Sequence, residues 1–359
     1  MVLVERRAAI VIEQEMVLNE RQRGLNTSED LREKLHSLPL PRFATFYSTG
    51  HGVGRSSAVY NMAALLAATG ERTLLIDLDV ERPGFSQTLA PNSKWGVLDL
   101  FNELLEKPRS LTAQTLQNDL IQKRLAEEGH LSHHPLSEQL ASLNQDGVSS
   151  FDFLPASSSD NYSYLHQLCR FQEKQARDIF GKNMFNLAVR LKATLSGNYD
   201  YVLVNSPSGF SQLSLFALVS LGNTDVLLTS LGEQHRSGLQ IVLEKLSLTY
   251  FFMRIIPVIS PVPDGDLEAA KAEQDIKDLI DKAIPHFDKS DRLPLELHFN
   301  PHLLYKLPII SDVSPGSYLD RDYLELLQAI RGRINPREQY ELRLLPKNVP
   351  QKQDSLPFP

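Results

Sequence analysis

Short apolar runs alternate with helix-prone stretches along most of the chain. Runs of this length, bounded by glycine, proline or polar residues, favour buried β-strands. Five such runs are residues 43–48, 72–79, 199–209, 224–231 and 254–263, and residues 149–157 are a sixth candidate. Between them lie stretches with apolar residues at helical spacing, such as 56–70 and 238–251. This alternation predicts an α/β fold with a doubly wound, mostly parallel sheet flanked by helices.

The chain outside these runs is more polar. Residues 1–40 predict an N-terminal helical extension, which is either a solvated surface or an arm that binds a partner. We expect residues 41–335 to form the main domain, with a helical insertion at about 101–148. Within the insertion, the HLSHH segment at 130–134 suggests a metal site, but a solvent-facing loop is favoured because no carboxylate or cysteine partner is evident. Residues 336–359 are rich in proline and predict an extended tail.

Composition narrows the class of protein. The chain is 42% hydrophobic and 23% charged, which is ordinary for a globular protein. It has no apolar run long enough for a transmembrane helix, and charge interrupts its start too early for a secretory signal. A single cysteine, Cys169, excludes an intrachain disulfide. We therefore expect a cytoplasmic protein, and the net charge of −7 argues against a broad nucleic-acid surface.

The first apolar run leads into a glycine-containing segment, FYSTGHGVGRSSA at 46–58. Phosphate-binding loops use glycine because a side chain would crowd the phosphate that their backbone N–H groups hold. Compared with the pattern G-x-x-x-x-G-K-[ST], Thr49 replaces the first glycine and Arg55 replaces the lysine. Taken alone, the segment is either a modified phosphate loop or an ordinary strand-to-helix turn.

Two carboxylates follow the second apolar run. Asp77 and Asp79 stand at its end, in the sequence LIDLDVERPG. A helix between two parallel strands returns the chain to the same side of the sheet, so these residues should lie level with the glycine segment. Acidic side chains there hold Mg²⁺ or polarise an attacking water. The bland alternative is that each aspartate only caps a turn.

Together these segments resemble a known family. The stretch FYSTGHGVGRSSAVYNMAALLAATGERTLLIDLDVERPGFSQTL is similar to the MinD/ParA group of deviant Walker A P-loop ATPases, which have the SIMIBI-type fold. It resembles most the bacterial branch whose loop reads K-G-G-V-G-R. The segments FDFLPASSSDNYSYLHQL, YDYVLVNSPSGFSQL and PVISPVPDGD extend the resemblance over most of residues 43–265.

The resemblance implies roles for individual residues. Arg55 would contact phosphate and take part in catalysis, and Asp79 would lie near the attacking water. Ser56, Asp77 and Asn205 would form the magnesium site. The remaining nucleotide-binding positions would be Gly50, His51, Gly52, Val53, Gly54 and Ser57 in the loop, with Pro261 and Pro263 near the base.

The sequence also departs from the family pattern. Gly50 occupies the position of a second lysine that reaches the partner's nucleotide in a sandwich dimer, and Asn205 replaces an aspartate. An amide brings no negative charge to Mg²⁺. We therefore expect ATP or ADP to bind with Mg²⁺, and hydrolysis to be slow or impaired.

The expected function is a nucleotide-binding switch that forms a homodimer and assembles with a protein partner in a bacterial multi-component system. It would not insert into a membrane. The main alternative is a pseudo-ATPase scaffold without turnover. A DNA-partition ATPase is disfavoured by the acidic charge and by the lack of the cross-dimer lysine.

Overall fold

The fold is seen in a computed structural model of the chain, and fourteen ranges of it are described. These are residues 41–106, 125–127, 130–136, 140, 150–158, 160–175, 188, 191–192, 195, 197–247, 255–263, 267–283, 294–298 and 318–334. The expected N-terminal extension, most of the expected insertion and the expected Pro-rich tail lie outside these ranges.

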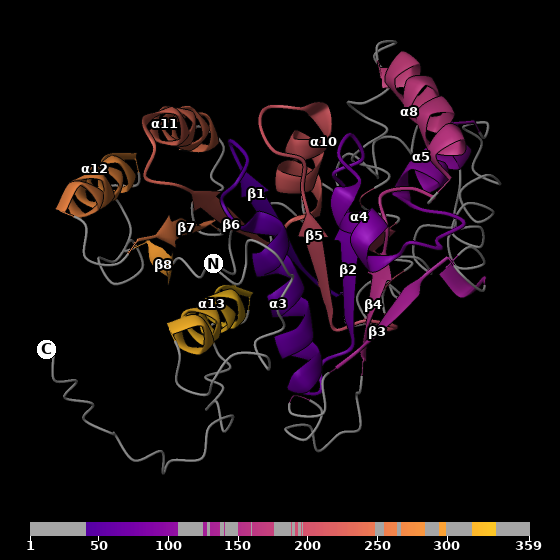
Figure 1. Cartoon of the computed structure of the whole chain (residues 1–359), viewed down its shortest axis with the longest axis horizontal. Coiled ribbons are helices and arrows are strands. Elements are labelled where there is room, and N and C mark those ends of the chain that lie inside the picture. The colour runs from indigo at the N-terminus through magenta and orange to yellow at the C-terminus, as the bar shows by residue number, and fades with distance from the viewer. Residues whose placement is uncertain are drawn as a thin grey trace, which may run out of the picture.

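An eight-stranded sheet forms the centre of the molecule, in the order β3-β4-β2-β5-β1-β6-β7-β8 (Figure 1). Every neighbouring pair is parallel except β3 and β4. The strands are β1 (Arg42–Ser48), β2 (Thr73–Asp77), β3 (Ser132–Pro135), β4 (Ser150–Leu154), β5 (Tyr201–Asn205), β6 (Thr224–Thr229), β7 (Ile255–Val262) and β8 (Leu295–His298). The predicted doubly wound, mostly parallel sheet is therefore confirmed.

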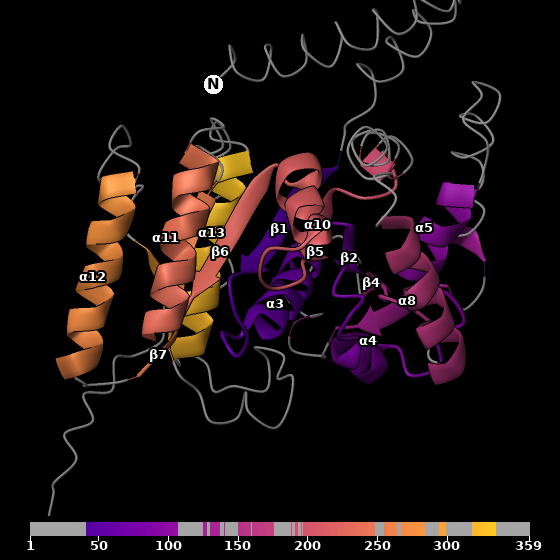
Figure 2. The ribbon, with the colours of Figure 1, turned by 90° about the horizontal axis from the view of Figure 1, so that it is seen from above.

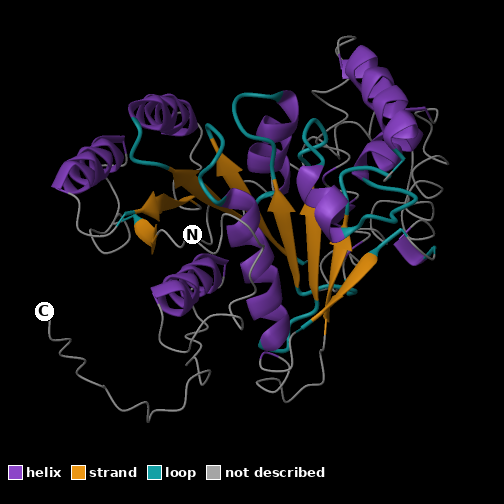
Figure 3. Cartoon of the chain, in the orientation of Figure 1, coloured by secondary structure: helices purple, strands orange, loops and turns teal. Residues whose placement is uncertain are grey.

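Helices cover both faces of the sheet (Figure 3). On one face lie α3 (Arg55–Ala68), α4 (Gly84–Leu89) and α13 (Tyr318–Ile334). On the other lie α5 (Val97–Glu106), α8 (Asn161–Gln175), α10 (Gln212–Leu215), the π-helix η1 (Phe216–Leu221), α11 (Glu233–Ser247) and α12 (Leu267–Ala283). Figure 2 shows α11 and α12 at one end of the sheet and α5 and α8 at the other. Among the helices of the described ranges, none has the length and apolar character that crossing a membrane requires.

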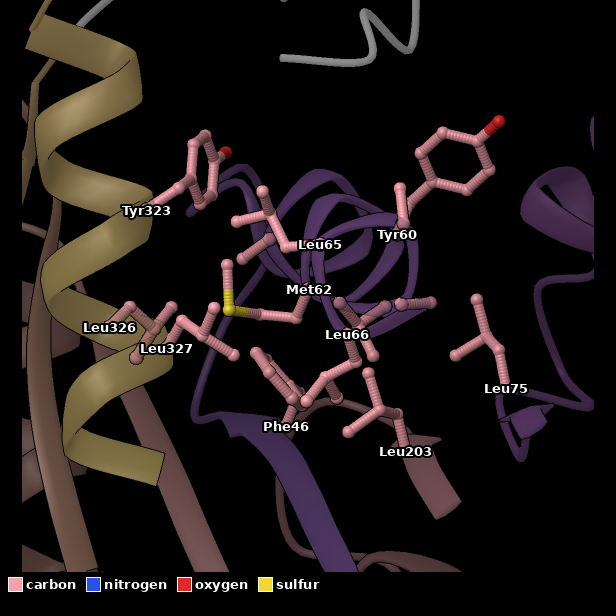
Figure 4. Close-up of a cluster of buried hydrophobic side chains, with 14 of the residues drawn as sticks. Phe46, Tyr60, Met62, Leu65, Leu66, Leu75, Leu203, Tyr323, Leu326 and Leu327 are labelled. Atoms are coloured by element: carbon pink, nitrogen blue, oxygen red, sulfur yellow. The ribbon is translucent and has the colours of Figure 1, made fainter. Parts of the chain in front are cut away.

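Helix α3 lies in the most enclosed position. Its sequence is rich in alanine, leucine and methionine, which are strong helix formers. It is apolar on almost all sides because it packs between the sheet and α13. Figure 4 shows Met62 and Leu66 between the sheet residues Phe46 and Leu203 and the α13 residue Leu327. This packing fixes the start of α3, and with it the preceding loop, against the sheet.

Strand register brings polar residues to one edge. Asp77 at the end of β2 pairs with Asn205 at the end of β5. Asn205 is also in register with Phe46, two residues before the end of β1 at Ser48. The carboxyl ends of three adjacent parallel strands therefore meet where ligands bind in open α/β sheets.

Strand β3 differs from the sequence interpretation, which placed a solvent-facing loop around His133 and His134. The segment instead pairs antiparallel to β4, with His133 opposite Asp152. His133 Nδ1 lies 2.5 Å from Asp152 Oδ1, and the His134 ring stacks on Phe151. Both histidines thus have structural partners far away in the sequence. In the described ranges, no three His, Cys, Asp or Glu residues are grouped to hold a metal.

Candidate nucleotide-binding site

The loop between β1 and α3 has the backbone shape of an anion cradle. Gly52 and Gly54 have φ angles of 75° and 69°, a left-handed conformation that strains any residue with a Cβ. Gly54 is also the N-cap residue of α3, and no side chain of the described residues caps the helix there. The first N–H groups of α3 therefore face the loop, where the helix dipole favours an anion.

Arg55 connects this loop to two neighbouring strand ends. Its Nη2 donates to Asp79 Oδ2 at 2.7 Å, its Nε to Asn205 Oδ1 at 3.0 Å and its Nη1 to Ser48 Oγ at 3.2 Å. The Arg55 and Asp79 side chains are only 9% and 10% exposed. Burial lowers the pKa of Arg55 and raises the pKa of Asp79, and the ion pair opposes both shifts. Three residues singled out from the sequence are thus brought into contact.

Asp77 lies beneath this pair and is fully buried. Its Oδ1 accepts hydrogen bonds from Asn205 Nδ2 at 2.8 Å and from the Asp79 amide at 3.1 Å. Its Oδ2 accepts from Ser86 Oγ at 2.5 Å, and Ser86 Oγ in turn accepts from the Ala156 amide at 2.7 Å. Burial raises the pKa of Asp77 to about 6. Asp77 therefore has a structural role even without a ligand.

His51 lies on the exposed outer side of the loop. Its ring contacts the guanidinium of Arg82, from the segment between β2 and α4, and its Nδ1 lies 2.8 Å from Ser208 Oγ. Partial desolvation and the nearby cations Arg82 and Arg55 lower the pKa of His51. Three separate loops, after β1, β2 and β5, are therefore linked through one imidazole.

Helix α11 approaches the loop closely at two glycines. A Cβ added at Gly50 would lie 2.4 Å from His235 Cε1, and one added at Gly238 would lie 2.7 Å from Thr49 Cβ. Both distances are shorter than side chains tolerate. The Gly50 contact is with the His235 ring, which can turn, whereas the Gly238 contact is with the Cβ and Oγ1 of Thr49. The fit between the loop and α11 therefore depends chiefly on Gly238.

We expect Gly238→Ala to destabilise the protein by about 1–3 kcal/mol, because the added methyl group overlaps Thr49 and forces the loop and α11 apart. Gly332→Ala, in helix α13, is the matched control. A Cβ at Gly332 meets nothing within 4 Å, so this change should stabilise by up to about 1 kcal/mol through helix propensity. Chemical denaturation followed by circular dichroism measures both. Equal effects of the two changes would contradict the close contact.

A cavity of about 490 Å³ opens beside the loop, on the side of α11. Its lining comes from the loop, from the segment that enters α11 and from the end of β7. The lining residues are His51, Gly52, Ser230, Leu231, Gly232, His235, Pro261 and Pro263. The two prolines assigned to the base from the sequence thus share one cavity with the loop.

The remaining loop residues differ in exposure. Ser56 and Ser57 are half-buried at the start of α3, and the Ser57 carbonyl accepts a hydrogen bond from Asn61. Val53 belongs to the loop, but its side chain is buried in the hydrophobic core. Only its backbone is therefore available to contact a ligand.

Several site residues were missed from the sequence. Ser86, Arg82 and His235 gain their positions from contacts between distant segments, and their residue types alone gave no signal.

The oxygen atoms gathered here suit Mg²⁺, which binds carboxylate, hydroxyl and amide oxygens. Asp77, Asp79 and Asn205 supply carboxylate and amide groups in mutual contact, and Ser56 is the hydroxyl residue that follows Arg55 in α3. One oxygen of Asp79 and the amide oxygen of Asn205 accept hydrogen bonds from Arg55. A metal ion bound at these two oxygens would therefore compete with the Arg55 guanidinium.

Comparison with known proteins gives limited sequence support. A scan against protein-family models finds no match. The chain is 48% identical over 46 residues to the succinoglycan biosynthesis transport protein ExoP of Rhizobium meliloti (strain 1021). Those residues make up 13% of this chain and 6% of ExoP, so the match describes one segment and not a whole protein.

Solved structures show the fold. A structure of pNOB8 ParA superposes with a TM-score of 0.53 and 14% identity, covering 83% of this chain and all of that one. Cobyrinic acid a,c-diamide synthase from Mycobacterium smegmatis, solved with bound ADP and magnesium, gives a TM-score of 0.52 and 16% identity. That match covers 83% of this chain and 97% of the synthase. The chain therefore has the fold of the ParA-type P-loop ATPases.

Proposed function

We propose that this chain is a nucleotide-binding switch protein of the MinD/ParA type, in the branch with arginine in the loop. It binds ATP or ADP with Mg²⁺ at residues 50–57 and hydrolyses ATP slowly. The ATP-bound form dimerises and engages a protein partner in a bacterial multi-component system. The observation that carries the proposal is the glycine loop with Arg55 beside Asp77 and Asp79 at the carboxyl edge of the sheet.

Binding depends on groups that already point at the loop. The N–H groups at the start of α3 face the phosphates, and Arg55 is the nearest buried cation. Arginine binds phosphate oxygens in a bidentate manner, as it binds carboxylates. When a phosphate arrives, Arg55 exchanges its bond to Asp79 for one to the ligand, which leaves Asp79 free to orient water. The cavity next to Pro261 and Pro263 has room for the base.

Slow turnover follows from the same contacts. Catalysis requires interactions that are stronger with the transition state than with bound ATP. Arg55 is held on Asp79, Asn205 and Ser48, which restricts its movement with the transferring group. Asn205 brings no charge to the metal, and Gly50 brings no cation to a partner. When bound, Mg²⁺ would neutralise the charge that develops on the phosphates.

Calorimetry of the purified chain with ATP and ADP, with and without Mg²⁺, tests the proposal. We expect both nucleotides to bind, and Ser56→Ala to weaken ATP binding roughly tenfold in the presence of Mg²⁺ only, because its hydroxyl ligates the metal. Ser237→Ala, at an exposed position of α11, is the control and should change nothing. If the unmodified chain binds neither nucleotide, nucleotide binding is wrong.

The second candidate is a scaffold without nucleotide. One observation favours it: Asp77 and Asp79 already have hydrogen-bond partners within the chain. The two functions differ in what ATP does to assembly. Light scattering should show a larger mass with ATP and Mg²⁺ for a switch, and the same mass with and without nucleotide for a scaffold.

A further inference from the structure

The inner part of the candidate site holds more negative than positive charge. Arg55 is the cation in contact with this cluster, and it faces the two carboxylates of Asp77 and Asp79. A nucleoside triphosphate adds several more negative charges. Part of these is offset by Mg²⁺, but the outermost phosphate needs a further cation close to the loop.

Arg82 is in the position to supply it. Its backbone N–H donates to the Asp79 carbonyl at 3.0 Å, and this turn holds residue 82 beside the second carboxylate. Its guanidinium extends to the loop and contacts the ring of His51. Arg82 also lies near enough to lower the pKa of both His51 and Arg55. The cation therefore stands at the outer rim of the cradle that Gly52 and Gly54 form.

Within the part of the chain that the structure describes, the Arg82 guanidinium forms no ion pair, although its charge opposes the rise that burial causes in the pKa of the nearby Asp79. Its contact there is an imidazole whose pKa is lowered, so the ring favours its neutral form and accepts a hydrogen bond from the guanidinium. By contrast, Arg55 and Arg72 each face a carboxylate, Asp79 and Asp200. Arg82 is also exposed, so binding an anion there requires no rearrangement of the core.

His51 holds Arg82 in this place. Its ring nitrogens contact both the Arg82 guanidinium and Ser208 Oγ, so the imidazole links these two side chains. The same ring lines the cavity beside the loop. His51 therefore both lines the cavity and contacts the Arg82 guanidinium, so it connects the space proposed for the base with the proposed outer cation.

We propose that Arg82 binds the terminal phosphate of a nucleoside triphosphate held in the same subunit, and that His51 is the residue that positions it. This inference rests on the proposed nucleotide site. The outer cation then comes from the subunit that holds the nucleotide, and ATP binding needs no residue of a second copy. It also makes the site prefer a triphosphate, because a diphosphate does not reach Arg82.

The test compares ATP with ADP. Arg82→Gln should weaken ATP binding about 10-fold to 100-fold, the range for losing a hydrogen bond between charged groups, and should change ADP binding less than about threefold. Arg82→Lys should retain part of the preference because it keeps the charge but loses the bidentate geometry. Arg321→Gln is the control, since Arg321 is exposed on α13 and pairs with Glu325. Calorimetry with Mg²⁺ measures all four proteins.

His51→Ala tests the positioning role. It should lower the preference for ATP over ADP in the unmodified chain, but have no further effect on that preference when Arg82 is already replaced by glutamine. Equal losses of ATP and ADP binding in Arg82→Gln, or no loss of either, would overturn the inference while leaving nucleotide binding intact. A chain that binds neither nucleotide before any substitution overturns the proposed function itself, so the two failures are distinct.

Discussion

Replacing Arg55 by methionine should destabilise the protein by about 3–5 kcal/mol, the range for removing one partner of a buried ion pair. The methionine side chain would fill much of the same volume but leave the Asp79 carboxylate buried without its cation. Ser48 and Asn205 would also lose a hydrogen-bond donor. Adding Asp79→Asn to Arg55→Met should recover a large part of the loss, with a coupling energy of about 2 kcal/mol. Urea denaturation of the four proteins completes this double-mutant cycle.

The pair between Arg72 and Asp200 is the matched control. Its side chains are 49% and 37% exposed, so water screens the charges. Arg72→Met should cost less than about 1 kcal/mol. If Arg55→Met lowers the free energy of unfolding no more than Arg72→Met does, the buried network does not stabilise the fold. Breaking the contacts of Arg55 would then cost little free energy.

A second large effect is expected in the core beneath the loop. Leu66→Ala should lower the free energy of unfolding by about 2–5 kcal/mol. The Leu66 side chain is fully buried and lies near Phe46 and Leu203 (Figure 4), where removing its methyl groups leaves a cavity between α3 and the sheet. The same denaturation experiment measures this change.

Leu165→Ala provides the comparison for the same side chain at the surface. Leu165 lies on α8 and is 58% exposed, so truncation there should change stability by less than about 0.5 kcal/mol. Because the loop runs directly into α3, Leu66→Ala should also weaken nucleotide binding, which Leu165→Ala should not. Similar losses at the two positions would show that α3 is loosely packed.

The central sheet could be predicted from the sequence because its strands are buried on both faces. Continuous apolar runs therefore marked β1, β2, β5, β6 and β7 within a few residues of their ends. Strand β3 gave no such signal, since its sequence SHHP is polar and it is held by pairing with β4. Strand β8 is only four residues long, with sequence LELH, and was also missed. Short strands at the two edges of a sheet depend on their neighbours more than on their own composition.

The candidate site was partly predictable for a related reason. Glycines and strand-end carboxylates are set by local backbone requirements, which the sequence displays. The chemical partner of each side chain is a tertiary property. Arg55 was expected to face phosphate, and the structure places it on Asp79 and Asn205. Whether it moves to a ligand stays a prediction, which the ATP and ADP titrations address.

The contact between Thr49 and Gly238 has a consequence for sequence variation in relatives of this protein. Because the two residues touch without room for another methyl group, the choices at positions 49 and 238 are linked. A relative with a larger residue at 238 should carry glycine at 49, and one with a branched residue at 49 should keep glycine at 238. Such covariation would indicate that relatives preserve the close contact between α11 and the loop.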